Sequence, residues 1–491
     1  MKKVLKNVLK GVHIIKKIGK ETSQWIIGIS ISSPMIHKHM IFIAIKGEQT
    51  DGHFFIEEAI KNGSQTIVCE YVPISYQKNV LYILVPNSKK ALGKISSNFY
   101  ENPTKKIKLI GITGTNGKTS VAYILHQLFS NIGKKSILIS TIGVKILSKV
   151  YPNSHTTPNI IDINKYLYVS IRKGCQYAFM EVSSHGIHQQ RIEGLSFEGG
   201  IFTNITHDHL DYHQSFHHYL YTKRNFFQSL SKKSFALINI DDKNSHKITR
   251  NILAKKYFYG LKNNKNFFVK VLRKNLNGSQ LLIDGTYPIF TKIIGKFNIY
   301  NILAVYATSI LLQMDKDIII KNLSNIKPVK GRFEQFLSKK GIRIIVDYAH
   351  NPNGLKSVLK TITDLTKKKD SKLICVVGCG GNRDRKKRSI MGKMVYETCD
   401  ISIFTSDNPR SEDPHNIIKD MKNFSSYLNS KKNFSFINRK QAINQAIQIA
   451  NKNDIVLIVG KGHENYQEIK GIQYPFNDMK IAKKFLFDNK K

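Results

Sequence analysis

The chain has 491 residues, of which 41% are hydrophobic and 23% charged, a balance typical of folded globular proteins and not of disordered chains. This length is too great for one ordinary core, and at about 100–200 residues a domain it predicts about three domains. No apolar run approaches the roughly 20 residues that cross a bilayer, so no membrane insertion is expected.

The net charge of +43, from 77 basic and 34 acidic residues, is the most unusual feature of the composition. Such a surplus can bind nucleic acid or another polyanion, because the bound phosphates release counterions. The lysines, however, are scattered through every segment and do not gather on one element, which indicates a compositional bias. No nucleic-acid partner is therefore expected, although the charge alone leaves that alternative open.

The N-terminus and the cysteines indicate the cellular compartment. The basic start, Met1 to Lys6, is followed by a stretch that lysines keep interrupting, without the apolar segment or cleavage site of a signal peptide. The five cysteines are odd in number and lack CxxC spacing, which argues against a disulfide framework and a zinc ribbon. Both observations predict a cytoplasmic protein.

Residues 1–104 are predicted to form a small N-terminal α/β domain. Apolar, β-rich runs at 25–29, 40–45 and 66–69 predict strands, and the segment at 56–60 predicts a helix.

Residues 105–330 are predicted to form a central, P-loop ATPase-like domain with a mostly parallel sheet. Buried strands at 108–113, 177–182 and 235–239 alternate with helical segments, as in other α/β domains.

Residues 331–491 are predicted to form a C-terminal, Rossmann-like α/β domain. Helix breakers recur around 327–331, and four apolar strands follow them. These strands span 342–346, 373–377, 401–405 and 455–459. The predicted fold class is therefore α/β with three domains.

The motif GTNGKTS, at 114–120, follows the first central strand and opens a helix. Backbone N–H groups in such a turn bind phosphate, with the helix N-terminus behind them. Lys118 adds a positive charge, and Thr119 adds a hydroxyl that can bind Mg²⁺. Ile112 stands where the strict pattern has glycine, so the loop belongs to a variant class. The residues predicted to bind a nucleotide here are Gly114, Thr115, Asn116, Gly117, Lys118, Thr119 and Ser120.

Two further central strands end in polar segments. Glu181 closes one of them, where a carboxylate can bind the Mg²⁺ of the same nucleotide. The segment 203–213 is dense in histidine and aspartate, which suits a transition metal, Mg²⁺ or merely a solvated loop. Because no HExxH or CxxC motif accompanies it, a hard cation shared with the nucleotide is the more economical interpretation.

Polar residues also follow each of the four C-terminal strands, at the edge where open α/β sheets bind their ligands. Arg383 and Arg410 offer two planar guanidinium groups for carboxylates, and Glu464 offers a carboxylate for a cationic amine. The segments concerned are 346–352, 378–385, 407–410 and 460–464.

The motifs and their order resemble the Mur ligase family, and the likeness covers nearly the whole chain. DNPR at 407–410 resembles the branch of the family that uses diaminopimelate. The other motifs are GTNGKTS at 114–120, MEVSSHG at 180–186, TNxxxDHLDYH at 203–213, GKFNxxN at 295–301, GRFE at 331–334 and DYAHNP at 347–352.

The resemblance implies an ATP-dependent carboxylate–amine ligase of peptidoglycan synthesis. Its partners would be ATP, UDP-MurNAc-L-Ala-D-Glu and meso-diaminopimelate, its cofactor would be Mg²⁺, and it would be a monomer. ATP would phosphorylate the D-glutamyl carboxylate, and the amine would then attack the acyl phosphate. Such catalysis consists mainly of positioning and charge neutralisation.

The resemblance also implies roles for single residues. The catalytic set is Lys118, Glu181, His209 and Lys223. The metal ligands are Thr119, Glu181, His209 and Lys223, the last as N6-carboxylysine. Further ATP contacts are Asn301, Arg332, Asp347 and His350. The UDP-MurNAc-dipeptide residues are Ile31, Ser33, Glu48, Gln49, Thr50, Thr156, Thr157, Ser183, Gln189 and Arg191. The diaminopimelate residues are Arg383, Asp407, Asn408, Pro409, Arg410, Gly460 and Glu464.

Three alternatives stay open at this point. Another ligase of the same superfamily, such as a folylpolyglutamate synthase, would share the P-loop but should lack Arg383, DNPR and KGHE. A basic nucleotide-binding protein would bind nucleic acid with steep salt dependence. A degenerate, non-catalytic member is the third alternative. If the ligase interpretation holds, assembly of the site requires domain closure about a hinge near Pro328–Gly331.

Overall fold

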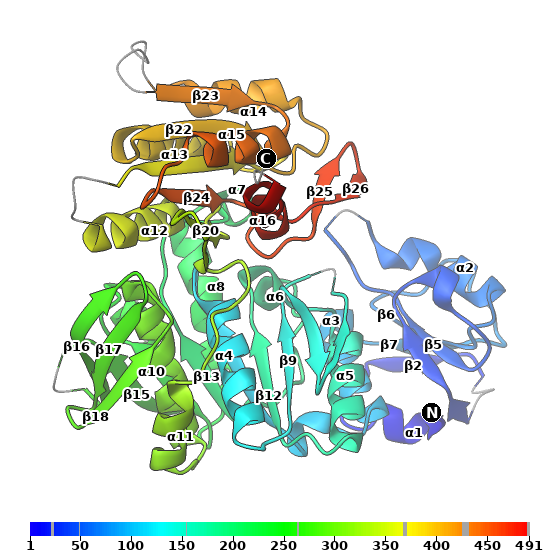
Figure 1. Cartoon of the computed structure of the whole chain (residues 1–491). Coiled ribbons are helices and arrows are strands. Elements are labelled where there is room, and N and C mark those ends of the chain that lie inside the picture. The colour runs from blue at the N-terminus through cyan, green and yellow to red at the C-terminus, as the bar shows by residue number, and fades with distance from the viewer. Residues whose placement is uncertain are drawn as a thin grey trace.

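The computed structural model describes residues 1–20, 24–48, 50–153, 155–262, 265–366, 371–424 and 432–488. Three α/β units follow one another along the chain, each built on its own main sheet (Figure 1). The predicted α/β class is therefore confirmed. Each main sheet lies within one of the ranges 1–104, 105–330 and 331–491, and the boundaries themselves stay a prediction.

The N-terminal unit, blue in Figure 1, has a five-stranded sheet in the order β2-β7-β6-β5-β4. Strands β4 to β7 are parallel, and β2 is antiparallel to β7. The run predicted as one strand at 25–29 is divided, because β3 pairs with β1 while β4 pairs with β5. The elements are β1 (Lys3–Val4), α1 (Leu5–Val8), β2 (Lys16–Ile18), β3 (Trp25–Ile26), β4 (Gly28–Ser30), η1 (Ser33–Met35), β5 (Met40–Ile43), η2 (Gly52–Phe55), α2 (Ile56–Lys61), β6 (Thr66–Cys69), β7 (Leu81–Leu84) and α3 (Ser88–Phe99).

The central unit has an eleven-stranded sheet in the order β11-β10-β9-β12-β8-β13-β14-β15-β16-β17-β18. The strands from β9 to β16 in this order are parallel, as predicted, and each edge carries an antiparallel extension. The central strands named from the sequence are only β8, β12 and β14, so β9, β10, β11 and β15 to β18 were not predicted, and β13 was predicted only as a strand before residue 203, without bounds. The strands are β8 (Lys108–Thr113), β9 (Ser136–Ser140), β10 (Gly143–Ile146), β11 (Lys149–Tyr151), β12 (Tyr177–Glu181), β13 (Gly199–Phe202), β14 (Phe235–Asn239), β15 (Lys255–Gly260), β16 (Phe267–Asn275), β17 (Gly278–Ile283) and β18 (Tyr287–Thr291).

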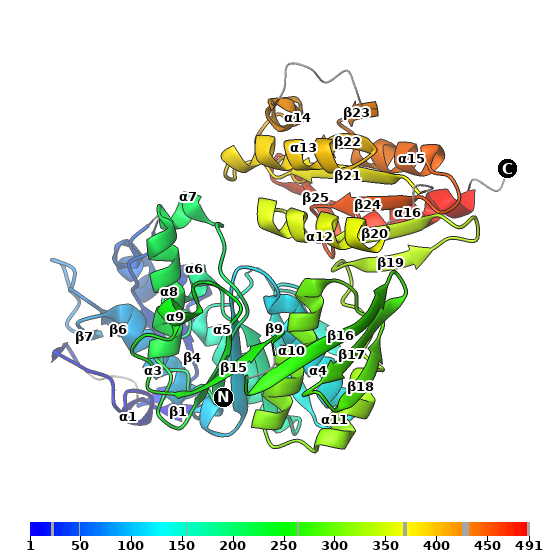
Figure 2. The same cartoon turned by 90° about the vertical axis from the view of Figure 1, so that its left-hand side faces the viewer.

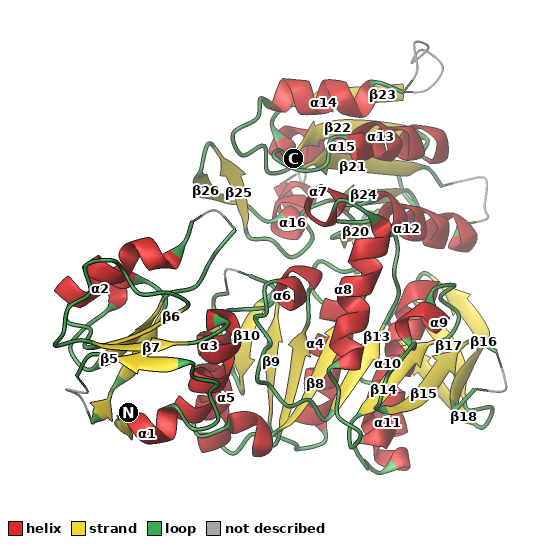
Figure 3. Cartoon of the chain, turned by 180° about the vertical axis from the view of Figure 1, so that it is seen from behind, coloured by secondary structure: helices red, strands yellow, loops and turns green. Residues whose placement is uncertain are grey.

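Helices cover both faces of this sheet (Figures 1 and 3). Alternate residues of a strand point to opposite faces, so Ile110 and Ile112 of β8 pack with α4 and α10, while Leu109 packs with α5 and α8. Burial on both faces explains why these strands are continuous apolar runs. The helices are η3 (Pro103–Lys105), α4 (Lys118–Asn131), α5 (Ile160–Arg172), α6 (Ser184–His188), α7 (Leu210–His213), α8 (Phe216–Gln228), α9 (Ser245–Ile248), α10 (Lys296–Leu311) and α11 (Lys316–Leu323).

The C-terminal unit has a six-stranded sheet in the order β19-β20-β24-β21-β22-β23, parallel except for β19. Helices α12, α13 and α14 pack on one face and α15 and α16 on the other. The elements are β19 (Glu334–Leu337), β20 (Arg343–Asp347), α12 (Pro352–Leu365), β21 (Leu373–Cys379), α13 (Lys386–Thr398), β22 (Ile401–Ser406), α14 (Pro414–Lys422), β23 (Lys432–Phe436), α15 (Arg439–Ile449), β24 (Ile455–Val459), β25 (Tyr466–Ile469), β26 (Ile472–Pro475) and α16 (Asp478–Asp488).

The N-terminal unit lies beside the central one, and the C-terminal unit stands above it (Figures 1 and 2). Ile160 of α5 belongs to the N-terminal core, which ties the first unit to the second. None of the helices in the described part of the chain combines the length and the apolar character that a membrane crossing requires.

Candidate active site

The loop between β8 and α4 is held in a shape that only glycine permits. Gly114 and Gly117 have φ of 148° and 91°. A Cβ at Gly114 would lie 1.9 Å from the Thr203 hydroxyl, and one at Gly117 would lie 2.6 Å from Oδ1 of Asn301. The Thr203 hydroxyl donates to the Asn116 carbonyl at 2.7 Å. The loop is thus pinned to the end of β13, with the N-terminus of α4 free to bind an anion.

Lys118 and Thr119 begin α4 at the centre of the site. The Lys118 ammonium donates to the Gly114 and Thr115 carbonyls, at 2.8 Å each. Burial lowers its pKa, an effect that the charges of Glu181 and Asp208 oppose. The Thr119 hydroxyl lies 3.1 Å from Nη2 of Arg332, which comes from the C-terminal unit.

Glu181 ends β12 and is almost fully buried. Its carboxylate accepts the Thr141 N–H at 2.9 Å and the Thr141 hydroxyl at 3.3 Å. His209 caps the short helix α7 with φ of 53°, and its Nε2 lies 3.8 Å from Asp208 Oδ2. Burial lowers the pKa of His209 to about 4, so its imidazole is neutral at pH 7 and can bind a cation.

Lys223 of α8 is the predicted site of modification. Its side chain is buried, and Nζ donates to the Gly114 carbonyl at 2.9 Å. Burial and the nearby charge of Lys118 hold its pKa well below the usual range. The neutral amine that results is the form that reacts with electrophiles.

A cavity of about 980 Å³ brings the predicted catalytic residues together. Its walls come from the P-loop, from the ends of the central strands and from the C-terminal unit. Within the described residues, no three His, Cys, Asp or Glu side chains are grouped closely enough to hold a metal ion by themselves. Lys118, Thr119, Glu181, His209 and Lys223 all line the cavity.

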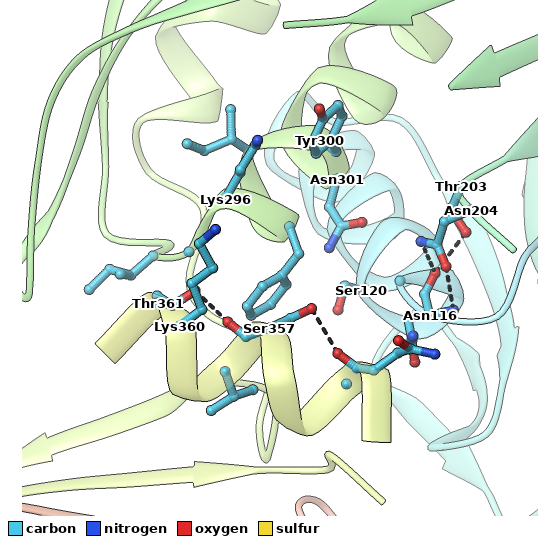
Figure 4. A pocket seen from close by; sticks show the side chains of 18 of the residues that line it. Asn116, Ser120, Thr203, Asn204, Lys296, Tyr300, Asn301, Ser357, Lys360 and Thr361 are labelled. Carbon is cyan, nitrogen blue, oxygen red and sulfur yellow. Dashed lines mark hydrogen bonds between the residues drawn. The ribbon is translucent and has the colours of Figure 1, made fainter. Parts of the chain in front are cut away.

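A second cavity, of about 560 Å³, lies between the central and C-terminal units (Figure 4). Three of the predicted ATP residues, Asn301, Arg332 and Asp347, line it, whereas His350 lines the larger cavity. Burial raises the pKa of Asp347 to about 6, and its Oδ2 accepts the Phe333 N–H at 2.7 Å. The two cavities share the walls formed by Asn116, Gly117, Arg332 and Tyr348.

Sequence analysis missed the wall that α12 gives to this second cavity. Ser357, Lys360 and Thr361 face Asn116 and Ser120 across it (Figure 4). Their spacing of three and four residues places them on one helix face. That spacing, directly after DYAHNP, is the signal that could have identified them.

The residues predicted for the UDP-MurNAc-dipeptide fall into two groups. Five of them, Glu48, Thr156, Ser183, Gln189 and Arg191, line the larger cavity. Thr157 lies behind them, where its hydroxyl donates to the Glu181 carbonyl at 2.8 Å. Gln189 Nε2 donates to Glu48 Oε1 at 3.0 Å, which joins the N-terminal and central units.

The remaining dipeptide predictions lie in the N-terminal unit. Ile31, Ser33 and Thr50 are not among the described residues that line either large cavity. The Ser33 hydroxyl instead donates to Glu58 Oε2 at 2.7 Å, and Ile31 packs against the N-terminal core. Gln49 lies outside the described residues.

The residues predicted for diaminopimelate gather at the far end of the larger cavity. Arg410 has φ of 54° and donates from Nη1 to the Gly381 carbonyl at 2.6 Å, and its Nε lies 3.3 Å from Glu468 Oε2. Gly460 has φ of 113°, and a Cβ there would lie 2.3 Å from Asp407 Oδ2. Pro409 is not among the described residues that line the cavity, whereas the other six are, namely Arg383, Asp407, Asn408, Arg410, Gly460 and Glu464.

Lys461 was not predicted, yet it organises this end of the cavity. Its fully buried ammonium donates to Asn408 Oδ1 at 2.8 Å and to Glu464 Oε2 at 2.9 Å. Asn408 Nδ2 donates to the same Glu464 oxygen at 2.8 Å. A charged group is buried only when it is paired and hydrogen-bonded, and Lys461 meets both conditions. The sequence signal that could have identified Lys461 is its place in the polar segment 460–464, between the predicted residues Gly460 and Glu464.

Comparison with known proteins gives one consistent result. Models of the Mur ligase family match the chain in three parts, namely the catalytic domain at 26–100, the middle domain at 112–309 and the glutamate ligase domain at 331–462. UDP-N-acetylmuramoyl-L-alanyl-D-glutamate–2,6-diaminopimelate ligase of Cytophaga hutchinsonii is 45% identical over 483 residues, 98% of this chain and 99% of that protein. The Phocaeicola vulgatus protein of the same name is 44% identical over 479 residues, 98% of each chain.

The fold gives the same relationship. A solved structure of a UDP-N-acetylmuramoyl-L-alanyl-D-glutamate–2,6-diaminopimelate ligase superposes with a TM-score of 0.71 at 28% identity, covering 100% of both chains.

Proposed function

The chain belongs to the Mur ligase family, and from this we propose that it joins meso-diaminopimelate to UDP-MurNAc-L-Ala-D-Glu at the expense of ATP. The product is the tripeptide precursor of peptidoglycan, with ADP and phosphate released. One observation carries the proposal, since a single cavity is lined both by Lys118 and Thr119 of the P-loop and by Arg383, Arg410 and Glu464. Phosphate-binding and amino-acid-binding groups thus face one reaction space.

The chemistry follows from this arrangement. A carboxylate is a poor acyl donor until phosphorylation gives it a good leaving group, so the D-glutamyl carboxylate first takes the γ-phosphoryl group of ATP. The neutral amine of diaminopimelate then attacks the acyl carbon, the C–N bond forms, and the C–O bond to phosphate breaks. The chain contributes by holding three reactants in line and by neutralising charge.

We assign the nucleotide to the two adjoining cavities. The P-loop N–H groups and Lys118 hold the phosphates at the start of α4. The base and ribose occupy the cavity of about 560 Å³, whose walls include Asn301, Arg332 and Asp347. His350, on the wall of the larger cavity, lies on the phosphate side.

Mg²⁺ fits the residues at the phosphate end. Glu181 offers a buried carboxylate whose hydrogen-bond donors, among the described residues, are the two of Thr141 named above. Thr119 and His209 offer a hydroxyl and a neutral imidazole on the wall of the same cavity. Mg²⁺ normally keeps several waters and takes one or two carboxylates with substrate phosphates, so a closed protein cage is not required. When bound, it would neutralise charge on the phosphates.

Lys223 is proposed to carry the carbamate. A buried, neutral amine can add to CO₂, which turns a potential cation into an anion beside the P-loop. This modification would supply a further oxygen ligand for Mg²⁺. The Tyr219 ring, with its centroid 4.7 Å from Nζ, and the Gly114 carbonyl hold the amine against the P-loop.

The dipeptide is assigned to the wall formed by Thr156, Ser183, Gln189 and Arg191, with Glu48 reaching it from the N-terminal unit. Diaminopimelate is assigned to the end formed by Arg383, Asp407, Asn408, Arg410, Gly460 and Glu464. The remaining predicted contacts, Ile31, Ser33, Gln49, Thr50, Thr157 and Pro409, stay predictions, as do the monomeric state and the cytoplasmic location.

The deciding experiment measures phosphate release by the purified protein with Mg-ATP and UDP-MurNAc-L-Ala-D-Glu, with meso-diaminopimelate or L-lysine as acceptor and product identified by mass. We expect turnover with diaminopimelate to be at least about tenfold faster than with lysine, because an arginine can bind the extra carboxylate, which lysine lacks. Faster turnover with lysine would refute the acceptor assignment, and no turnover with either would refute the proposed function.

A further inference from the structure

Tyr348 is the one side chain of the DYAHNP motif that lines both cavities. It follows Asp347, the last residue of β20, and therefore stands at the carboxyl edge of the C-terminal sheet. Tyr348 is not one of the predicted site residues, and no step of the proposed reaction uses it. Its ring contacts Arg332 of the proposed nucleotide site, and its hydroxyl contacts Glu464 of the proposed amino-acid site.

The ring of Tyr348 supports the arginine of the nucleotide site. Cζ of Arg332 lies 4.3 Å from the ring centroid, within the range of a cation–π contact. The same guanidinium reaches across to the P-loop, with Nη2 at 3.1 Å from the Thr119 hydroxyl. The ring therefore helps to fix where Arg332 meets the phosphate end of the site.

The hydroxyl of Tyr348 supports the carboxylate of the amino-acid site. It donates to Glu464 Oε1 at 3.4 Å, while Lys461 and Asn408 donate to Glu464 Oε2. Both oxygens of the Glu464 carboxylate therefore accept hydrogen bonds from side chains that follow the strands of the C-terminal sheet. Burial and the neighbouring carboxylates raise the pKa of Tyr348, which keeps the hydroxyl protonated and able to donate.

The backbone around the ring leaves it little freedom. A Cβ at Gly462 would lie 2.6 Å from the Tyr348 Cβ, and a Cβ at Gly331 would lie 2.0 Å from the His463 backbone nitrogen. The segment that carries Glu464 is therefore packed directly on Tyr348 and on the connection between the central and C-terminal units. This close packing fixes the distance between the ring and the carboxylate.

We propose that Tyr348 is a positioning residue that serves both halves of the reaction, its ring aligning Arg332 for ATP and its hydroxyl aligning Glu464 for diaminopimelate. This inference rests on the proposed function. Two substitutions test the ring and the hydroxyl separately. Tyr348→Phe removes only the hydroxyl, whereas Tyr348→Leu removes both the hydroxyl and the ring.

The test measures KM for each substrate with the full-length protein. For Tyr348→Phe we expect KM for diaminopimelate to rise about threefold to tenfold, the effect of losing one hydrogen bond to a charged group, with KM for ATP unchanged within about twofold. For Tyr348→Leu we expect KM for ATP to rise as well, by about threefold or more, because the cation–π contact is also lost. Tyr474→Phe, at an exposed position in β26, is the matched control and should behave as wild type.

A double-mutant cycle distinguishes positioning from general packing. If the hydroxyl acts through Glu464, Tyr348→Phe should add less than about twofold to the diaminopimelate KM of a Glu464→Ala background, which lacks the acceptor. Acyl phosphate formation can be measured without diaminopimelate, as the ADP formed in a single turnover. Its rate in Tyr348→Phe should equal that of the wild type, which would show that the variant is folded.

The outcomes are separable. A wild-type protein that does not turn over diaminopimelate refutes the proposed function itself. An active wild type with an unchanged diaminopimelate KM in Tyr348→Phe, or with equal increases of both KM values, overturns only the role of Tyr348.

Discussion

Arg410 is the residue on which we propose that the choice of amino acid depends. Diaminopimelate is lysine with one more carboxylate on its distal carbon, and a guanidinium can bind that carboxylate through two parallel hydrogen bonds. The left-handed φ of 54° and the hydrogen bond to the Gly381 carbonyl direct the side chain along the cavity wall. The partial pairing with Glu468 keeps the arginine in place before substrate arrives.

Replacing Arg410 by alanine should therefore lower kcat/KM for diaminopimelate by more than about tenfold. The measurement is product formation at varied diaminopimelate, with UDP-MurNAc-L-Ala-D-Glu and ATP saturating. Arg385→Ala is the matched control, because that arginine is largely exposed and pairs with Asp420 on the surface. An unchanged rate in Arg410→Ala would remove this residue from the specificity argument.

At the scale of elements, the start of α4 shows how one loop is shared by several parts of the chain. The P-loop is tied to the end of β13 through Thr203, its carbonyls accept hydrogen bonds from the Lys118 and Lys223 side-chain nitrogens, and Gly117 faces Asn301 of α10. The loop therefore depends on close approach as well as on a left-handed backbone.

Gly117→Ala separates these two requirements when it is compared with Gly133→Ala. Both glycines have positive φ, but a Cβ at Gly117 would lie 2.6 Å from Asn301 Oδ1, whereas one at Gly133 would meet nothing within 4 Å. We expect Gly117→Ala to raise KM for ATP by about tenfold or more, since the loop and Asn301 must both move.

The control, Gly133→Ala, should lower the free energy of unfolding by only about 1 kcal/mol, the cost of a left-handed alanine, without changing KM for ATP. Denaturant unfolding and steady-state kinetics measure the two effects. Equal ATP binding in the two variants would contradict the role given to close approach.

At the scale of the whole molecule, the site exists only where three units meet. Arg332 contacts Thr119, Asn351 Nδ2 donates to Asp208 Oδ2 at 3.0 Å, and Gln189 contacts Glu48. A single connection links α11 to β19, and it includes the segment Pro328–Gly331 with Gly331 at φ of 66°. Units of one chain that meet at such an interface commonly move as bodies about a connection of this kind.

We therefore expect the radius of gyration from X-ray scattering to decrease when a non-hydrolysable ATP analogue, UDP-MurNAc-L-Ala-D-Glu and diaminopimelate are added together. Closure would exclude water from the acyl phosphate and bring the amine to it. Scattering curves that stay identical with and without these ligands would refute the hinge prediction.

The sequence by itself predicted whatever depends on local order. Apolar strands alternating with helices indicated parallel α/β units, and polar segments at strand ends indicated the cavity walls, because parallel strands place those ends on one edge. Glu181, Arg383 and Glu464 were identified in this way, and all three line the larger cavity.

Only the tertiary structure decided which residues line the same cavity and which side chains form hydrogen bonds with each other in the interior. Tyr348 and Lys461 contact residues that are distant in the sequence. Tyr348 and Glu464 are 116 residues apart, and Lys461 and Asn408 are 53 apart. Conversely, the Ser33 hydroxyl is occupied by Glu58 within its own unit. Such contacts depend on how sheets and helices pack in three dimensions, and no local pattern of residue types encodes that packing.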